Sequence, residues 1–219
     1  MPTRVKVCCI SSVAEAAIAI AQGAHAVGLV SAMPSGPGVL DESKIAAIAR
    51  TIPVGVASFL LTSRVGSEEI IAQQRRCATT TIQICDRLEP GAHDHLRKSL
   101  PGIGLVQVIH VQDERALDEA REVAPFVDTI LLDSGRPNAA QAELGGTGRV
   151  HDWDVSRRIC DAVSVPVYLA GGLCPDNVKA AIATVRPFGV DVCSGLRTDD
   201  QLDPAKVAAF FEAITEADA

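Results

Sequence analysis

The sequence predicts an α/β protein whose parallel strands close into a single (β/α)8 barrel, the TIM-barrel architecture. Short β-branched runs alternate with Ala-rich segments of helical period, and the alternation recurs about every 20–30 residues. Such alternation requires parallel strands, because each helical crossover returns the chain to the same end of the next strand. An open doubly wound sheet is disfavoured, since no Gly-x-Gly-x-x-Gly follows the first strand. We therefore expect one barrel domain over residues 1–219.

The pattern gives eight strand-helix units in chain order. The strands are expected at 4–10, 26–31, 54–61, 79–84, 103–110, 128–133, 166–170 and 189–193. The helices are expected at 12–22, 41–50, 67–77, 92–99, 113–124, 153–163, 175–185 and 204–216. The expected helix caps are Ser11 or Ser12, Asp41, Ser67, Asp154 and Asp203. The long connection 134–151 breaks the rhythm, and we expect it to form a lid over the C-terminal mouth of the barrel.

Composition and charge exclude several classes of protein. With 47% hydrophobic and 21% charged residues, the chain is too apolar for intrinsic disorder. The formal net charge of −7 disfavours binding to nucleic acid or to an anionic membrane. No apolar run reaches the roughly 18 residues of a membrane span, and the N-terminus lacks a signal-peptide core. We therefore expect a cytoplasmic protein that acts on a small molecule, as a monomer or a homodimer.

The seven cysteines are interpreted as reduced thiols. They lie among apolar residues, without a Cys-x-x-Cys pair or a histidine at metal-ligand spacing, so no metal site is expected. Most are small buried groups, and one or two are candidates for chemistry. They are Cys8, Cys9, Cys77, Cys85, Cys160, Cys174 and Cys193.

Two of the expected strand ends carry groups suited to acid-base chemistry. Alternation along the first strand turns Cys8 into the lumen and Cys9 toward the helices, and Asp133 ends the sixth strand. Barrel enzymes place catalytic groups at this end of their strands, so Cys8 and Asp133 form a candidate pair of thiolate base and carboxylic acid. The alternatives stay open: Cys8 as a small core residue, and Asp133 as the cap of a turn.

Lys6 is also expected to face the lumen. We interpret it as a structural residue that pairs with an inward acid such as Asp191 in the barrel floor. A Schiff-base lysine of an aldolase is the less favoured alternative.

Glycine-rich turns follow the seventh and eighth strands, where barrels of this kind commonly bind phosphate. Glycines there let backbone N–H groups approach an anion closely, although ordinary turn glycines would look the same. A further glycine run lies in the expected lid. The candidate phosphate-binding residues are Gly146, Thr147, Gly148, Gly171, Gly172, Ser194 and Gly195.

Five segments in order resemble one enzyme family over nearly the whole chain. They are Lys6-Val-Cys-Cys-Ile10, Leu131-Leu-Asp-Ser134, Gly145-Gly-Thr-Gly148 with His151-Asp-Trp153, Leu169-Ala-Gly-Gly-Leu173 with Pro175 and Asn177-Val178, and Gly189-Val-Asp-Val-Cys-Ser-Gly195. The chain resembles the phosphoribosylanthranilate isomerases. The two glycine segments at their matching positions are the specific signals, whereas the Lys-x-Cys start alone would be weak.

The resemblance implies an Amadori rearrangement of N-(5-phosphoribosyl)anthranilate to 1-(2-carboxyphenylamino)-1-deoxyribulose 5-phosphate in tryptophan biosynthesis, without metal or organic cofactor. Cys8 matches the family's general base and Asp133 its general acid. The late glycines and Ser194 match its phosphate grip.

The chain departs from the family pattern at three places, one beside the mouth and two at the aromatic end of the pocket. Cys9 replaces a glycine, Pro37 replaces the arginine that clasps the anthranilate carboxylate, and Cys85-Asp86 replaces His-Gly. An arginine-carboxylate pair is bidentate and charge-assisted, so proline is no conservative replacement. We therefore predict that the phosphosugar half of the site is retained and the aglycone half is changed.

Three arginines are candidates for a substitute cation, namely Arg136, Arg149 and Arg197, although solvated or phosphate-facing positions are favoured for each. Two other functions remain as alternatives. One is a paralogous enzyme acting on a different phosphorylated sugar. The other is a non-catalytic protein that binds a phosphate ligand, which the presence of both Cys8 and Asp133 disfavours.

Overall fold

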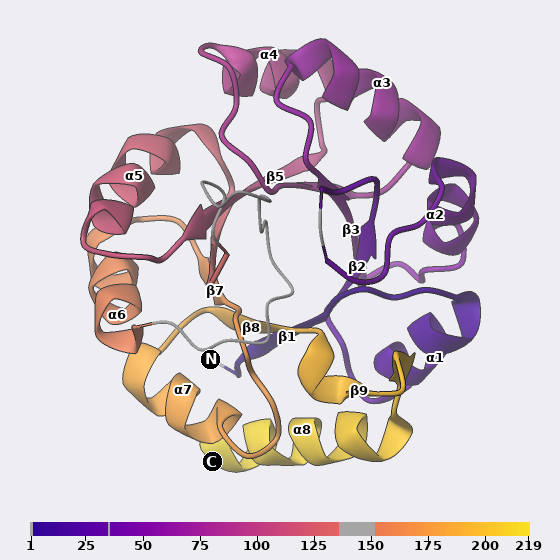
Figure 1. Cartoon of the computed structure of the whole chain (residues 1–219), viewed down its shortest axis with the longest axis vertical. Helices are drawn as coiled ribbons and strands as arrows, with labels where there is room; N and C mark the ends of the chain where they lie inside the picture. Colours follow the sequence, from indigo (N-terminus) through magenta and orange to yellow (C-terminus); the bar gives the residue numbers. More distant parts are fainter. Residues whose placement is uncertain (1, 35, 136–151) are drawn as a thin grey trace.

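The computed structural model describes residues 2–34, 36–135 and 152–219, and it confirms the (β/α)8 barrel (Figure 1). Each strand pairs in parallel with the next, and β8 pairs with β1 to close the ring. The barrel strands are β1 (Arg4–Val7), β2 (Ala26–Val30), β3 (Ala57–Thr62), β4 (Thr81–Ile84), β5 (Gly104–His110), β6 (Thr129–Asp133), β7 (Val167–Leu169) and β8 (Gly189–Val192). The helices outside them are α1 (Val13–Ala21), α2 (Glu42–Ala49), α3 (Ser67–Cys77), α4 (Ala92–Ser99), α5 (Arg115–Val123), α6 (Trp153–Ala162), α7 (Val178–Val185) and α8 (Pro204–Ala217).

Several element boundaries differ from the sequence prediction. β3 begins at Ala57 rather than residue 54, because Val54 lies fully exposed in the preceding turn. β1 ends at Val7 rather than residue 10, since the backbone of Cys9 leaves the extended region. The short 3-10 helices η1 (Ala124–Phe126) and η2 (Ser194–Leu196) and the hairpin of β9 (Arg197–Thr198) and β10 (Gln201–Leu202) were not predicted.

The predicted helix caps are confirmed at two positions and corrected at two. Ser12 accepts a hydrogen bond from the backbone N–H of Glu15, and Asp203 accepts two at the start of α8. The cap of α6 is Asp152 rather than Asp154, and α3 is preceded by Gly66 rather than capped by Ser67. Asp41 is the N-terminal flanking residue of α2, although its side chain makes no capping hydrogen bond.

Strand alternation separates the core into two layers. Val5 and Val7 belong to the large outer cluster between strands and helices. A smaller inner cluster fills the lumen, and it includes Cys8, Leu131 and Tyr168. Because side chains alternate strictly along a barrel strand, the residues between the outer ones face the lumen.

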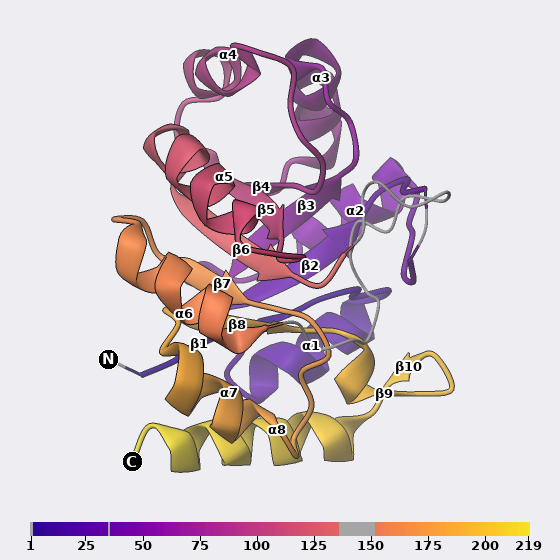
Figure 2. The ribbon, with the colours of Figure 1, turned by 60° about the vertical axis from the view of Figure 1, so that its left-hand side comes forward.

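The two termini meet at the end of the barrel away from the β9–β10 hairpin (Figure 2). The carboxylate of Asp218 accepts hydrogen bonds from the backbone N–H and the hydroxyl of Thr3, both at 2.7 Å. This contact fastens α8 against the strand that begins the chain. Within the described residues, no helix is long and apolar enough to cross a membrane.

Candidate active site

A buried ion pair forms the floor of the lumen, as the sequence predicted. Lys6 and Asp191 are register partners on β1 and β8, and Lys6 Nζ lies 2.8 Å from Asp191 Oδ2. Burial acts to lower the pKa of Lys6, but Asp191 and then Cys8 outweigh it and raise that pKa above its ordinary value. Lys6 is therefore a charged ammonium with a counter-ion, which argues against a Schiff-base nucleophile.

Cys8 follows β1 and points into the lumen above this pair. It is 6% exposed and belongs to the inner cluster. A Cβ added to Gly28 on β2 would lie 2.7 Å from Cys8 Sγ and 3.1 Å from Lys6 Nζ, so glycine makes room for both groups. The pKa of Cys8 is lowered by a hydrogen bond with the Cys9 thiol and by the Lys6 ammonium, against the opposing effect of burial.

Cys9 does not face the helices, which corrects the sequence prediction. Its φ is 59°, the left-handed region that L-residues rarely adopt, and this turn brings Cys9 into the inner cluster with Cys8. The Cys193 thiol after β8 donates a hydrogen bond to Cys9 Sγ at 2.7 Å. The inward-outward alternation of side chains along β1 does not extend to Cys9, because the regular strand ends at Val7.

Asp133 ends β6 on the same inward face as Leu131, two residues earlier. It is 8% exposed, and its Oδ1 accepts a hydrogen bond from the Ser134 N–H at 2.7 Å. Burial raises the pKa of Asp133 to about 6, against the opposing effects of Ser134 and Lys6. This carboxyl therefore keeps its proton to a higher pH than an ordinary aspartate.

Cys85, just after β4, is a buried thiol of the inner cluster that is influenced electrostatically by both Cys8 and Asp133. Cys85 is 1% exposed in the inner cluster. Its pKa is raised, first by burial and then by the negative charges of Cys8 and Asp133, so it lies within electrostatic range of both. Lys6 and Asp191 likewise act on the titration of both groups. The candidate base and acid thus share one charged environment at the barrel mouth.

The predicted phosphate turns after β7 and β8 pack against each other. Gly171 and Gly172 have φ values of 85° and 63°, which favour glycine. A Cβ added to Gly195 would lie 2.0 Å from the Leu173 carbonyl oxygen, so only glycine fits between the turns. Ser194 opens the 3-10 turn beside Gly195. The other predicted phosphate residues, Gly146, Thr147 and Gly148, lie outside the described residues.

Asn177 fixes the first of these turns and was not singled out as a site residue. Its Oδ1 accepts a hydrogen bond from the Cys174 N–H, and its Nδ2 donates to the Gly172 carbonyl, both at 2.9 Å. An asparagine directly before a helix after a glycine pair is the sequence signal for such a turn.

Arg197 is neither solvated nor a free cation, which corrects the prediction. Its guanidinium binds the Glu15 carboxylate in a bidentate pair at 3.1 and 3.0 Å, and it also donates to the carbonyls of Cys9 and Asp200. Burial acts to raise the pKa of Glu15, but Arg197 and the N–H groups of Ser11 and Leu202 lower it to about 2. Sequence reasoning missed Glu15, although Ser12-x-x-Glu15 has the spacing of a capping box. Arg136 and Arg149 lie outside the described residues.

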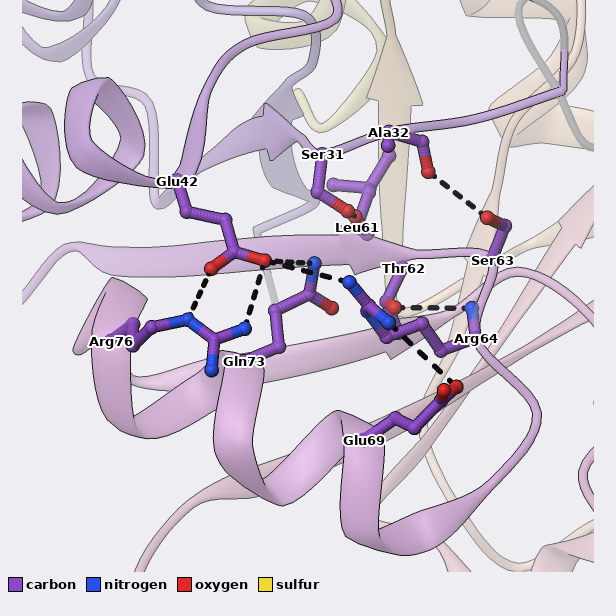
Figure 3. Close-up of polar contacts among 10 residues, drawn as sticks. All are labelled: Ser31, Ala32, Glu42, Leu61, Thr62, Ser63, Arg64, Glu69, Gln73 and Arg76. Carbon is purple, nitrogen blue, oxygen red and sulfur yellow. Dashed lines mark hydrogen bonds and ion pairs between the residues drawn. The ribbon is translucent and has the colours of Figure 1, made fainter.

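The rim at β2 and β3 is fastened by side chains (Figure 3). The Ser31 hydroxyl donates to the Leu61 carbonyl at 2.7 Å, and the Ser63 hydroxyl donates to the Ala32 carbonyl at 2.9 Å. Arg64 turns toward the helices, 3.7 Å from a carboxylate oxygen of Glu42 and of Glu69. This rim precedes the loop in which Pro37 stands.

Within the described residues no group of three or more His, Cys, Asp or Glu side chains could hold a metal ion.

Comparison with known proteins identifies the family. The profile of the family described as N-(5'phosphoribosyl)anthranilate (PRA) isomerase matches residues 5–213. The chain belongs to this family. A relative from Methanocella arvoryzae, named N-(5'-phosphoribosyl)anthranilate isomerase, is 34% identical over 209 residues, 95% of this chain and 96% of the relative.

Solved structures of family members have the same architecture. The phosphoribosyl anthranilate isomerase of Thermotoga maritima superposes with a TM-score of 0.82 at 28% identity, over 98% of this chain and 99% of that one. A second, in complex with reduced 1-(o-carboxyphenylamino)-1-deoxyribulose 5-phosphate, gives 0.80 at 25% identity over the same shares. The expected isomerase of tryptophan biosynthesis is thus confirmed at the level of the family, and these relatives give no support to the two alternative functions.

Proposed function

We propose that Cys8 and Asp133 are the general base and the general acid of the Amadori rearrangement of N-(5-phosphoribosyl)anthranilate. The observation that carries this assignment is the placement of both side chains, buried and inward, at the carboxyl ends of β1 and β6. The directions of their pKa values support it, since the pKa of Cys8 is lowered and that of Asp133 is raised to about 6. Two titratable groups whose environments push their pKa values apart are the pattern of an acid-base pair.

The proposed steps rearrange the substrate without adding or removing atoms. Asp133 gives its proton to the furanose ring oxygen, the C1–O bond breaks, and the anilino nitrogen lone pair forms the iminium ion. The Cys8 thiolate then removes the proton from C2. The electron pair of the broken C2–H bond forms a C1–C2 double bond and neutralises the iminium nitrogen, which gives the enolamine. Protonation at C1 and ketone formation at C2 complete the product. Lys6 stabilises the thiolate before the second step.

The phosphate is proposed to bind between the turns after β7 and β8, on backbone N–H groups near Gly172, Ser194 and Gly195. The positive φ values of the first turn and the close approach of Gly195 to Leu173 support this placement. The lid glycines Gly146 and Gly148 and the hydroxyl of Thr147 are proposed as further donors on the strength of the family resemblance. The ligand of the related complex, reduced 1-(o-carboxyphenylamino)-1-deoxyribulose 5-phosphate, carries a phosphate of this kind.

The test of the catalytic proposal follows the loss of phosphoribosylanthranilate fluorescence with the wild type and Cys8→Ala. Removing a general base lowers kcat by about 10²–10⁴-fold, and we expect a loss in that range. Binding of the reduced product analogue is expected to change by no more than a few-fold, since the phosphate turns are untouched. Turnover of Cys8→Ala near the wild-type rate would exclude Cys8 as the base.

A second prediction concerns the phosphate turn. Gly195→Ala is expected to raise KM about ten-fold with a smaller change in kcat, because the new Cβ would push the turn away from the Leu173 carbonyl. Steady-state kinetics measures both constants. Gly66→Ala is the matched control, since its Cβ would meet a single atom, in Glu89, at 3.8 Å. An unchanged KM for Gly195→Ala would place the phosphate elsewhere.

A further inference from the structure

Two cysteine thiols lie in direct contact beside the candidate active site. Cys9 follows β1 and Cys193 follows β8, and their sulfur atoms are 2.7 Å apart. Both are free thiols in the structure. An S–S bond is about 2.05 Å long, so the two sulfur atoms need to approach each other by only about 0.7 Å to form one.

The closing seam of the barrel brings these two residues together. Val7 on β1 and Val192 on β8 are register partners, and the Cys8 N–H donates to the Val192 carbonyl at 2.8 Å where the ladder ends. Cys193 continues the inward alternation of β8 and packs against the inner cluster. The positive φ of Cys9 brings its side chain into the same cluster. The contact therefore follows from the strand register and from one left-handed residue.

Further contacts keep the two turns from separating. Arg197, just beyond Cys193, donates a hydrogen bond to the Cys9 carbonyl. The same guanidinium is fixed by its bidentate pair with Glu15, at 3.1 and 3.0 Å. On the other side, a Cβ added to Gly38 would lie 2.8 Å from Cys9 Cβ, so the loop after β2 covers Cys9. Groups that are held in contact react as though they were highly concentrated.

The two thiols differ in their access to solvent. Cys9 is 4% exposed, whereas Cys193 is half-buried. The pKa of Cys9 is raised, chiefly by the hydrogen bond with Cys193, so Cys9 keeps its proton. Oxidation of a thiol follows its exposure and its thiolate character. An oxidant therefore reaches Cys193 first, and Cys9 lies where a resolving thiol is needed.

We propose that Cys9 and Cys193 are an oxidation site of this protein, a thiol pair that a peroxide converts to a disulfide across the β1–β8 seam. The Cys193 thiolate attacks one peroxide oxygen, the O–O bond breaks, and the departing hydroxide takes up a proton to give water. Cys193 is then a sulfenic acid. The Cys9 sulfur displaces its hydroxyl group, the S–S bond forms, and the Cys9 proton leaves with the hydroxyl as a second water. Two thiols are oxidised and one peroxide is reduced, and a dithiol reductant restores both thiols.

The disulfide joins the first strand of the barrel to the last. Residues 9 and 193 enclose most of the chain, and a cross-link over a long loop restricts the unfolded chain strongly. In the reduced protein, hydrogen bonds and side-chain packing hold this seam. Oxidation therefore adds a covalent fastening at the place where the barrel closes.

The test treats the reduced full chain with hydrogen peroxide, blocks the remaining thiols with iodoacetamide under denaturing conditions and maps the cysteine peptides by mass spectrometry. The expected result is the loss of two of the seven thiols and a peptide pair joined through Cys9 and Cys193. Dithiothreitol should restore both thiols. Cys193→Ser and Cys9→Gly are each expected to abolish the link. Cys174→Ser, which removes a half-buried thiol after β7, is the matched control and should form the link as the wild type does.

Fragmentation of the joined peptides distinguishes Cys9 from Cys8, because both lie in one tryptic peptide. A link through Cys8, or oxidation of Cys193 to a sulfinic acid without any link, would overturn the proposal. Glycine relieves the left-handed strain at residue 9, so Cys9→Gly is expected to fold. Thermal unfolding under reducing conditions checks each variant.

Thermal unfolding also measures the effect of the link on the barrel. The oxidised wild type is expected to unfold at least about 5 °C above the reduced wild type, because the link restricts the unfolded chain. Peroxide should not raise the Tm of Cys193→Ser. A linked wild type that unfolds at the reduced temperature would overturn the inference that the disulfide fastens the seam. None of these measurements uses turnover, so their outcome does not depend on the roles proposed for Cys8 and Asp133.

Discussion

Asp133→Asn is expected to lose about 10²–10⁴-fold in kcat and at the same time to make the folded protein more stable at neutral pH. The loss of activity follows from removing the proposed acid while keeping the size of the side chain. The gain in stability follows from burial, which raises the pKa of Asp133 from 3.8 to about 6. An ionised carboxylate at this position costs free energy that an amide does not.

The sign of the pH dependence is fixed by that shift. Below pH 3.8 Asp133 is protonated in both the folded and the unfolded chain and costs nothing. As the pH rises toward about 6, the unfolded chain releases the proton first, so the stability that is complete at low pH is progressively lost. A difference of about two pKa units corresponds to about 3 kcal/mol above pH 7. The asparagine variant should lack this loss.

Urea unfolding of the wild type and Asp133→Asn at pH 5 and pH 8 measures the effect, with a larger difference expected at pH 8. Asp128, just before β6, is the matched control: burial acts to raise its pKa, but Arg97 and the Leu105 N–H outweigh it and lower it. Asp128→Asn should therefore destabilise the protein at pH 8 and leave turnover intact. Equal stability of the wild type and Asp133→Asn at pH 8 would contradict the buried, weakly acidic carboxyl.

The pH dependence of catalysis provides a second measurement on the same variant. A general acid must hold its proton, so wild-type kcat/KM is expected to decline as the pH rises through about 6 in the free enzyme. Cys8 has the opposite effect, because a general base must be deprotonated: its titration makes kcat/KM rise with pH. The residual activity of Asp133→Asn should still rise with pH as Cys8 loses its proton. It should not show the decline at higher pH that loss of the Asp133 proton causes in the wild type.

The barrel and the Lys6–Asp191 ion pair at its floor could be predicted because the sequence patterns that indicate them are periodic. Alternation along β1 and β8 turns Lys6 and Asp191 inward, and strand order makes them neighbours across the seam. The same rule places Asp133 on the inward face of β6. Periodicity holds as long as the strand is regular, which is why these residues lie where the sequence indicated.

Prediction failed where the strands end. Cys9 was assigned to the helix side by a period of two, but its positive φ breaks the period one residue after Cys8. Glu15 and Arg197 were missed as a pair because they are far apart in the chain and meet only when β8 closes against β1. The glycine that the family resemblance implies at this position would indicate a left-handed turn, whereas the cysteine of this chain conceals it.

Lys6→Met is expected to destabilise the protein by about 3–5 kcal/mol at pH 8, because it leaves Asp191 ionised, buried and without a counter-ion. Lys6 is fully buried and Asp191 is 6% exposed. Among the described residues, Asp191 Oδ1 lacks a hydrogen-bond partner, and the Val192 N–H favours the charged carboxylate less than Lys6 does. The loss should shrink at pH 5, since burial raises the pKa of Asp191 and removal of the ammonium raises it further.

The double variant Lys6→Met/Asp191→Leu separates the pair from its parts. Replacing both members by apolar groups of similar size removes the desolvation cost along with the attraction, so most of the stability should return. Alkylation of Cys8 in this variant should still be slower at neutral pH than in the wild type, because the thiolate has lost the Lys6 charge. A single Lys6→Met variant as stable as the wild type would mean that the ion pair contributes nothing to the fold. A pH midpoint of Cys8 alkylation that is unchanged in the double variant would mean that the floor does not tune the proposed base.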